Sequence, residues 1–231
     1  MTTVTKLPAG ITDKARGTLV GDNGPVFDPD RVIRFDEDFL QFLAADYTIT
    51  GDTGDSEVRL STTEPNGVLE VFADSVGGSP VSAQQSSLPF SLDRDLWIET
   101  RFKVDSIAQT EVHVAISDID ASIRLRDTLG FLKETDGVLQ VITDNGTTEV
   151  ETPTGVSMVD DTYIRAGIHY YGGAFIDVYV DDLLVIEGLN IGVSQPGPTS
   201  NLGPSFSLIR NDASDRTLSV DYFNVYGLRA L

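Results

Sequence analysis

Acidic residues near the middle of the chain are the first that could carry chemistry. Asp118 and Asp120 form an Asp-x-Asp pair in a predicted loop, and Asp127 follows shortly after. Oxygen-rich loops of this kind can hold Ca²⁺, which takes about six to eight oxygen ligands. Apolar residues such as Ile119 and Ile123 interleave the pair, however, and no acidic cluster completes the shell. Asp118 and Asp120 are therefore weak metal candidates, and a solvated acidic loop is the favoured interpretation.

The two histidines of the chain, His113 and His169, are predicted to lie on the outward faces of two strands. Paired histidines can bind a metal ion or titrate near neutral pH. No third ligand accompanies them in the sequence. We expect exposed or partly buried side chains with no metal between them.

Sequence signatures of catalysis are missing. There is no Gly-x-Ser-x-Gly elbow, no P-loop and no Gly-x-Gly-x-x-Gly fingerprint. The chain has no cysteine, which excludes disulfides, thiolate metal sites and a cysteine nucleophile. The sequence predicts no catalytic residue, no cofactor and no enzymatic activity.

Alternation of apolar and polar residues defines the elements that must position any site. From Leu96 to Val104 the even positions are mostly apolar and the odd positions mostly polar, which is typical of a half-buried strand. The same alternation recurs in four further segments: 112–116, 164–168, 176–180 and 218–222. Many short strands separated by turn signals predict an all-β antiparallel sandwich or jelly roll.

Turn residues add detail to this prediction. Gly172-Gly173 and Asp181-Asp182 each separate two alternating segments and are expected to form hairpins, because glycine and aspartate tolerate positive φ. The best helix candidate is short, from Asp36 to Ala45, with acidic residues in its first turn.

Some large and cationic side chains fall on the outward positions of the predicted strands. The alternation turns five of them away from the core: Trp97, Arg101, Arg165, Phe175 and Tyr179. Tryptophan, tyrosine and arginine are enriched at the energetic centres of protein interfaces. The aromatic rings could equally stack on a sugar. We expect a protein- or sugar-contact face, unless an N-terminal segment or a long loop covers it.

Four stretches of sequence resemble concanavalin A-like lectin and glucanase domains, including the laminin-G-like branch. They match, in order, the opening strand (35–39, followed by 47–50), the central strand (97–104), the paired strands (163–170 and 175–185) and the closing strand (206–208, then 216–222) of that family. The resemblance implies a jelly-roll domain over residues 35–231, preceded by an extended arm over residues 1–34. Domains of this kind occur in lectins, in glycoside hydrolases and in accessory proteins of bacteriophage particles.

The chain departs from the hydrolases at the residues that matter most for catalysis. The hydrolases carry a strand with a Glu-x-Asp-x-x-Glu-like pattern, because retaining hydrolysis needs two carboxyl groups about 5 Å apart on one face. The nearest runs here are Glu111 to Asp118 and Ser117 to Asp120, and neither matches. A divergent glycoside hydrolase is therefore the least favoured function.

Charge is distributed unevenly along the chain. There are 36 acidic and 16 basic residues, a net charge of −20, so binding to nucleic acid is not expected. Residues 1–20 are the exception, with Lys6, Lys14 and Arg16 against Asp13 alone. Two interpretations stay open for these basic residues: a docking arm, or a frayed terminus. The sequence contains no apolar run of about 18 residues, so it predicts no membrane span.

The leading functional hypothesis combines these observations. The start of the chain lacks the apolar stretch of a signal peptide, although the fold it resembles is mostly found outside cells. Release by lysis would explain both, so we expect a virion protein made in the host cytoplasm, such as a capsid decoration or head accessory protein of a tailed phage. Its partners would be the major capsid protein or further copies, with a trimer as the first expectation. The alternative is a lectin-like carbohydrate-binding module on a tail or cell surface.

Overall fold

The computed structural model describes residues 32–51, 56–64, 67–75, 80–85, 90, 92–118, 127–197 and 202–228. Lys6, Lys14, Arg16 and Asp120 lie outside these residues. The described chain is built almost entirely of strands, and every paired strand is antiparallel to its neighbour. None of its helices is long and apolar enough to span a membrane.

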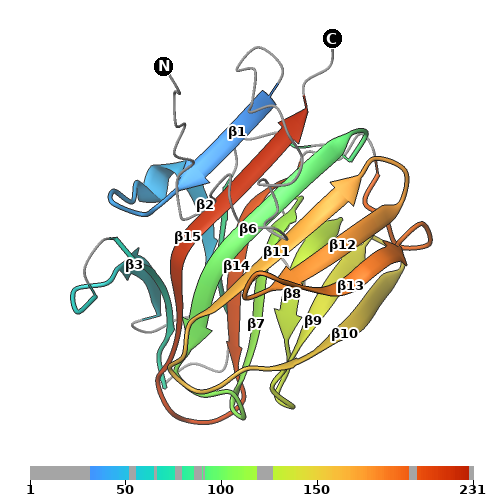
Figure 1. Ribbon diagram of the computed structural model, residues 1–231. Helices are drawn as coiled ribbons and strands as arrows, with labels where there is room; N and C mark the ends of the chain where they lie inside the picture. Colours follow the sequence, from blue (N-terminus) through green and yellow to red (C-terminus); the bar gives the residue numbers. More distant parts are fainter. Residues whose placement is uncertain are drawn as a thin grey trace, which may run out of the picture.

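Eight strands form what we call the front sheet, which faces the viewer in Figure 1. Its order is β13-β12-β11-β6-β15-β4-β3, and β1 also pairs with β15. The strands are β1 (Val32–Glu37), β3 (Glu57–Leu60), β4 (Leu69–Ala73), β6 (Asp95–Val104), β11 (Ile164–Tyr171), β12 (Phe175–Val180), β13 (Leu183–Asn190) and β15 (Arg216–Leu228).

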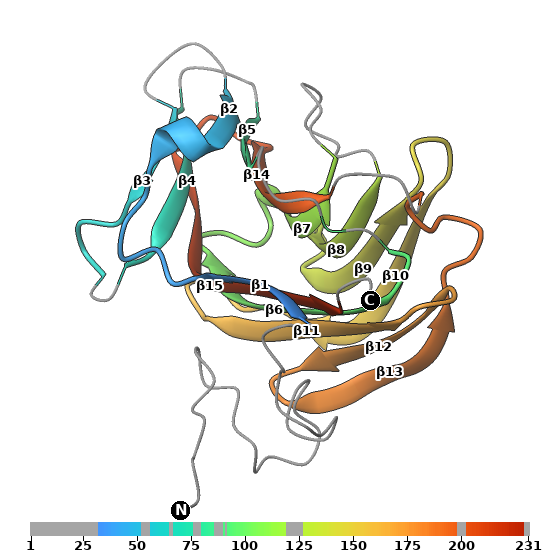
Figure 2. The ribbon, with the colours of Figure 1, turned by 90° about the horizontal axis from the view of Figure 1, so that it is seen from above.

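Seven strands form the back sheet, in the order β10-β9-β8-β7-β14-β5-β2. They are β2 (Tyr47–Thr50), β5 (Val81–Gln85), β7 (Thr110–Ser117), β8 (Thr128–Lys133), β9 (Val138–Asp144), β10 (Glu149–Ser157) and β14 (Gly203–Arg210). Figure 2 shows the two sheets as stacked layers of one sandwich. The predicted antiparallel jelly-roll architecture is confirmed.

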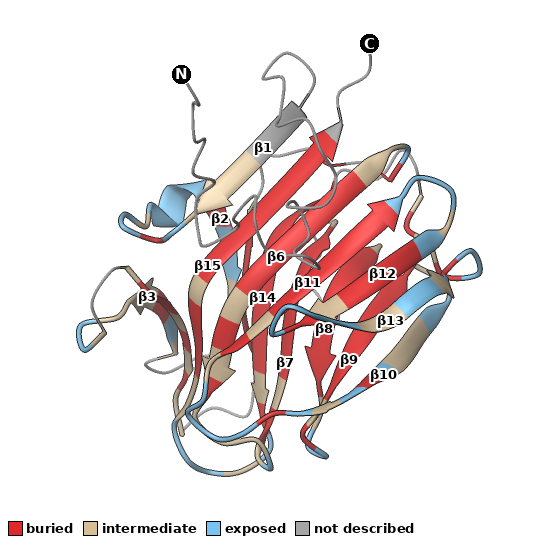
Figure 3. Ribbon diagram, in the orientation of Figure 1, coloured by how far each residue is buried: buried red, intermediate tan, exposed pale blue. Residues whose placement is uncertain are grey.

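The core lies between the two sheets and follows the predicted alternation. Ile98 and Phe102 of β6 are buried against the back sheet, whose Phe206 packs edge-to-face on Phe39 and Phe223 at centroid distances of 5.8 and 5.3 Å. The central strands of the front sheet are buried along most of their length (Figure 3). One continuous apolar core therefore joins the layers.

Both predicted hairpins are present. Gly172, Gly173 and Ala174 connect β11 to β12 with φ values of 60°, 130° and 76°. Asp181 and Asp182 connect β12 to β13 with φ values of 47° and 68°. In this two-residue turn, positive φ at both residues matches the right-handed twist of the flanking strands, and aspartate tolerates that conformation.

The best helix candidate of the sequence, from Asp36 to Ala45, does not form a helix of that length. Strand β1 continues to Glu37, and only a 3₁₀ turn, η2 (Ala44–Asp46), follows. The Phe39 backbone N–H donates to the Glu37 carboxylate at 2.9 Å, and Phe39 has a φ of 50°. This φ is incompatible with a right-handed helix, and it accompanies complete burial of the Phe39 ring. Strand β1 also begins at Val32, inside the range predicted for the arm.

Candidate functional site

The five predicted contact residues all lie on the outer face of the front sheet, the face that points away from the back sheet. They come from the adjacent strands β6, β11 and β12. Arg101 is paired with Arg165 across β6 and β11, and Tyr179 is paired with Gly167 across β12 and β11. Phe175 is 46% exposed at the start of β12. Residues separated in the sequence therefore share one surface, as the alternation predicted.

Trp97 does not match its predicted exposure. It occupies an outward position of β6 but is only 9% exposed. Its ring stacks on His169 at a centroid distance of 4.5 Å and an interplanar angle of 13°, and His169 contacts Tyr171 at 4.1 Å. Trp97 Nε1 and His169 Nε2 are buried without a hydrogen-bond partner. The expectation that Trp97 offers an open contact surface is wrong, because the ring is part of a packed aromatic stack.

The two histidines lie on different sheets, so they are not on neighbouring strands. His113 belongs to β7 of the back sheet and His169 to β11 of the front sheet. Both are buried rather than exposed, and burial lowers the pKa of His169. His113 Nε2 lies 3.2 Å from the Glu111 carboxylate. Within the described ranges, no group of three or more His, Asp or Glu residues could hold a metal ion; Asp118 follows β7 there, whereas Asp120 falls outside them.

A pocket of about 880 Å³ opens on the outer face of the front sheet. It gathers side chains from β1, β6, β11 and β15, from the segments that follow β1 and β12, and from the residue before β11. Its lining consists of Asp36, Asp38, Leu40, Arg101, Tyr163, Arg165, Asp181, Asp221, Tyr222 and Asn224. Two of the five predicted contact residues, Arg101 and Arg165, therefore line it.

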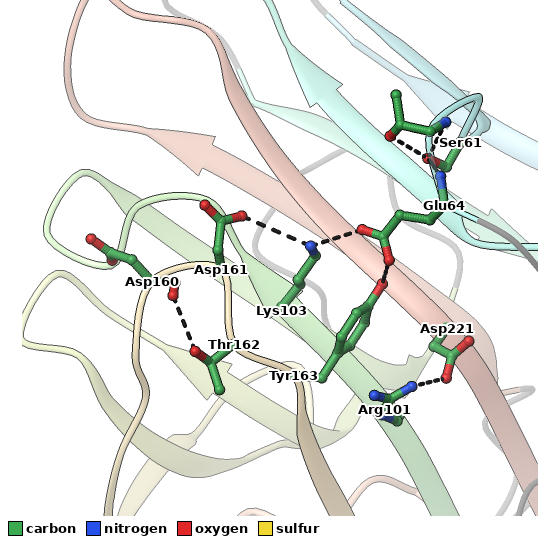
Figure 4. Close-up of polar contacts among 10 residues, drawn as sticks. Ser61, Glu64, Arg101, Lys103, Asp160, Asp161, Thr162, Tyr163 and Asp221 are labelled. Carbon is green, nitrogen blue, oxygen red and sulfur yellow. Dashed lines mark hydrogen bonds and ion pairs between the residues drawn. The ribbon is translucent and has the colours of Figure 1, made fainter.

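Both arginines of the pocket are held in place by carboxylates. Arg101 forms an ion pair with Asp221 and lies over the Tyr163 ring, 4.2 Å from its centroid (Figure 4). Arg165 forms an ion pair with Asp182 of the β12–β13 hairpin. Arg101 and Arg165 occupy directly opposed positions of β6 and β11, where two positive charges would repel each other. The two ion pairs offset this repulsion.

A second network borders the pocket beside Tyr163. The Tyr163 hydroxyl donates to Glu64 at 2.7 Å, and Lys103 lies 2.8 Å from the other Glu64 oxygen (Figure 4). Burial opposes ionisation of Glu64, but the hydrogen bonds from Lys103 and Tyr163 outweigh it and lower the pKa of that carboxyl. The Tyr163 side chain is therefore held at two points: Arg101 contacts the face of its ring, and Glu64 accepts the hydrogen bond of its hydroxyl.

Polar groups on β6 and β15 next to the pocket are buried. Glu99 is 5% exposed and accepts a hydrogen bond of 2.8 Å from Tyr222. Burial raises the pKa of Glu99 to about 7, although the Tyr222 hydrogen bond and the charge of Arg165 oppose the rise. Asn224, which is paired with Glu99 across the strands, is 1% exposed, and its Nδ2 has no hydrogen-bond partner.

Eight of the ten lining residues were missed by sequence reasoning, which predicted only Arg101 and Arg165. Tyr222 and Asn224 belong to β15, and Asp36 belongs to β1, far from β6 in the sequence. They reach the pocket because β15 lies between β1 and β6 in the sheet. Glu99 alone had a signal, since it occupies an odd position within the alternating segment from Leu96 to Val104.

The back sheet holds few carboxylates on its central strands. The strands β5, β14, β7, β8 and β9 contain only Glu111 and Asp144. Asp144 is paired with Thr128, which is paired with Ser117, six residues along β7 from Glu111. At about 3.3 Å per residue this places the two carboxylates roughly 20 Å apart. They cannot form the pair about 5 Å apart that retaining hydrolysis requires.

No family model and no curated protein matches the sequence. Solved structures do match the fold. A protein of unknown function from Shewanella oneidensis MR-1 aligns with a TM-score of 0.62 and 13% identity, over 87% of this chain and 90% of that one. A glycoside hydrolase family 16 endo-glucanase from Bacteroides ovatus aligns with a TM-score of 0.62 and 12% identity, over 83% and 99%. Peanut lectin aligns with a TM-score of 0.52 and 10% identity, over 87% and 99%.

These similarities establish the fold class. The chain has the concanavalin A-like jelly-roll fold, as the sequence resemblance implied. The fold is shared by lectins and glucanases, so function has to be argued from the site itself.

Proposed function

We propose that this protein is a non-enzymatic attachment protein of a virus particle, a capsid decoration or head accessory protein of a tailed bacteriophage. The observation that carries the proposal is the outer face of the front sheet, where Arg101, Arg165, Tyr163 and Tyr222 surround one pocket. Arginine and tyrosine are the residue types that contribute most to binding at protein interfaces. The partners are the major capsid protein or further copies of the chain, with a trimer as the expected assembly.

The back sheet supports a non-enzymatic role. On the strand that should carry the hydrolase pattern, the positions facing away from the core are Glu111, His113, Ala115 and Ser117. Along β7 itself, Glu111 is the single carboxylate at these positions, and it contacts the buried His113. The strongly acidic composition adds a further constraint, because it disfavours nucleic acid as a partner.

Purified particles test the proposal directly. Particles released by lysis of the strain that carries the gene are separated on a density gradient and analysed by mass spectrometry and by immunogold labelling with an antibody to this chain. We expect the chain to sediment with the particles and the label to lie on the heads. Absence of the chain from intact particles would overturn the proposal.

Carbohydrate binding is the second candidate function, favoured by the combination of a lectin-like fold with the tyrosine-lined pocket. A glycan array probed with the full chain tests it. Binding that is lost in Arg165→Ala and kept in Phe175→Ala would support this candidate, because Phe175 lies on the same face but does not line the pocket. Trp97→Ala is unsuitable here, since Trp97 is buried in the aromatic stack.

Hydrolysis can be tested separately. Lys133 of β8 is paired with Val112 of the antiparallel strand β7. Glu134 directly follows Lys133 and Glu111 directly precedes Val112, so the two carboxylates stand at the same end of this strand pair. If the chain cleaved a β-glucan and both Glu111→Gln and Glu134→Gln abolished cleavage, the non-enzymatic proposal would be wrong. We expect no release of reducing sugar from the unmodified protein.

A further inference from the structure

We infer that the outer-face pocket is the docking site for the basic N-terminal segment, residues 1–20, of a second copy of this chain. The inference rests on the proposed attachment function and specifies one of its contacts. Three features of the molecule support it: two carboxylates of the pocket that lack a cationic partner in the described part of the chain, a buried hydrogen-bond donor that lines the pocket, and the basic composition of the segment.

Two carboxylates of the pocket have no cationic partner within the described part of the chain. Asp38 accepts a hydrogen bond from the Leu40 backbone N–H at 3.3 Å. Asp181 accepts one from the Arg165 backbone N–H at 3.0 Å. Both side chains belong to exposed residues, and they reach the pocket from different elements, the segment after β1 and the β12–β13 hairpin. Asp221, by contrast, is already neutralised by Arg101. The pocket can therefore accept positive charge at two points.

Asn224 provides the second, independent indication of a ligand. Its side chain lines the pocket and is 1% exposed, and its Nδ2 donates to no acceptor. A buried donor without an acceptor is destabilising, so such groups are normally satisfied by a ligand, water or partner. A backbone carbonyl of an extended peptide would supply the missing acceptor.

The composition of residues 1–20 fits this chemistry. The segment carries Lys6, Lys14 and Arg16 against one acid, and Leu7 and Ile11 stand between the charges. Apolar contact is available at the pocket, because Leu40 lines it and is 63% exposed. Ammonium or guanidinium groups would meet the two unpaired aspartates, while the aliphatic side chains would cover the exposed leucine.

Chain length and net charge favour a second copy as the owner of the segment. From residue 20 to Val32 the chain can span up to about 40 Å. A domain of this size has a radius of gyration of about 16 Å, so the segment can reach a neighbour. Residues 21–231 carry a net charge of −22, and two such bodies repel one another. A basic segment placed in the acidic pocket of a neighbour offsets that repulsion.

Complementary charge reversal in the full chain tests the inference. One variant carries Lys6→Glu, Lys14→Glu and Arg16→Glu, and the other carries Asp38→Lys and Asp181→Lys. We expect the unmodified chain to self-associate in sedimentation velocity, and each variant alone to associate about tenfold more weakly or worse. An equimolar mixture should regain association, because each arm then meets a pocket of opposite charge.

The matched control is Asp136→Lys with Asp160→Lys. These exposed aspartates also accept only backbone N–H groups, from Val138 at 3.0 Å and Ile107 at 2.7 Å, but they do not line the pocket. The control should associate as the unmodified chain does. Far-UV circular dichroism and the Tm of each variant establish that folding is intact.

Three results would overturn the inference: an unmodified chain that is monomeric, a mixture that stays monomeric, or a control that weakens association as much as the pocket variant. These failures are distinct from failure of the proposed function. A chain found on particles whose association ignores the charge reversals keeps its attachment role and loses this docking site. A chain that associates through the pocket but is absent from particles keeps this docking site and loses its attachment role.

Discussion

Tyr222 donates a hydrogen bond of 2.8 Å to the carboxylate of Glu99, and both side chains are buried on the outer face of the front sheet. Burial raises the pKa of Glu99 to about 7, while the hydrogen bond from Tyr222 partly opposes the rise. A carboxyl that titrates near neutral pH beside a binding pocket links the stability of this face to pH, and that link can be measured.

Replacement of Glu99 by glutamine should change the pH dependence of stability. The folded chain holds the Glu99 proton more tightly than the unfolded chain, so the stability linked to this group is fully present below pH 4.5 and is lost as the pH rises through about 7. Glu99→Gln cannot ionise and escapes this loss. Its free energy of unfolding, relative to the unmodified chain, should improve by up to about 3 kcal/mol between pH 4.5 and pH 8.

Urea unfolding at both pH values measures this difference. A Glu187→Gln variant, at an exposed position of β13, serves as the control. A stability difference between Glu99→Gln and the unmodified chain that is the same at both pH values would show that Glu99 does not titrate in this range.

Removal of the Tyr222 hydroxyl should raise the pKa of Glu99, because the hydrogen bond from that hydroxyl lowers it. Without that donor, the ionised carboxylate loses its hydrogen bond, so Tyr222→Phe should raise the pKa of Glu99 further. Titration of the Glu99 side-chain carboxyl by ¹³C NMR detects the shift. An unchanged midpoint in Tyr222→Phe would mean that the hydrogen bond is absent in solution.

Truncation of Trp97 should affect stability more than binding. The ring is buried and stacked on His169, so Trp97→Ala should lower the free energy of unfolding by about 3–5 kcal/mol. Phe175→Ala, at an exposed position of the same face, should cost far less. Urea unfolding followed by far-UV circular dichroism compares them, and equal losses would argue against the observed burial of Trp97.

Gly130 in β8 should be intolerant of any side chain. A Cβ at this position would overlap Cα and Cβ of Ala115, its partner on β7. Because the overlap involves backbone, Gly130→Ala should destabilise the fold by about 3 kcal/mol or more. Gly51→Ala is the matched control, since its Cβ would lie 3.8 Å from Val81, an ordinary contact. Thermal unfolding of the two variants should differ clearly, and similar Tm values would contradict this packing.

Much of the fold could be predicted because strand alternation is a local property. The segment from Leu96 to Val104 showed its buried and outward positions directly, and Gly172-Gly173 and Asp181-Asp182 marked their hairpins. The short helix candidate from Asp36 to Ala45 did not form, because burial of Phe39 in the distant core outweighed local propensity. Local preference is weak beside tertiary packing.

The sequence by itself determined the class of fold, the absence of cysteine chemistry, the charge imbalance between residues 1–20 and the rest, and the common face of Arg101, Arg165 and Tyr179. Only the tertiary structure decided which of those outward side chains are buried and which strands lie beside them. Pairing of β15 between β1 and β6 brings Tyr222 and Asn224 to Arg101 from more than a hundred residues away in the chain. Such long-range pairing leaves no periodic trace in the sequence, because it depends on the register between strands rather than on the pattern within one.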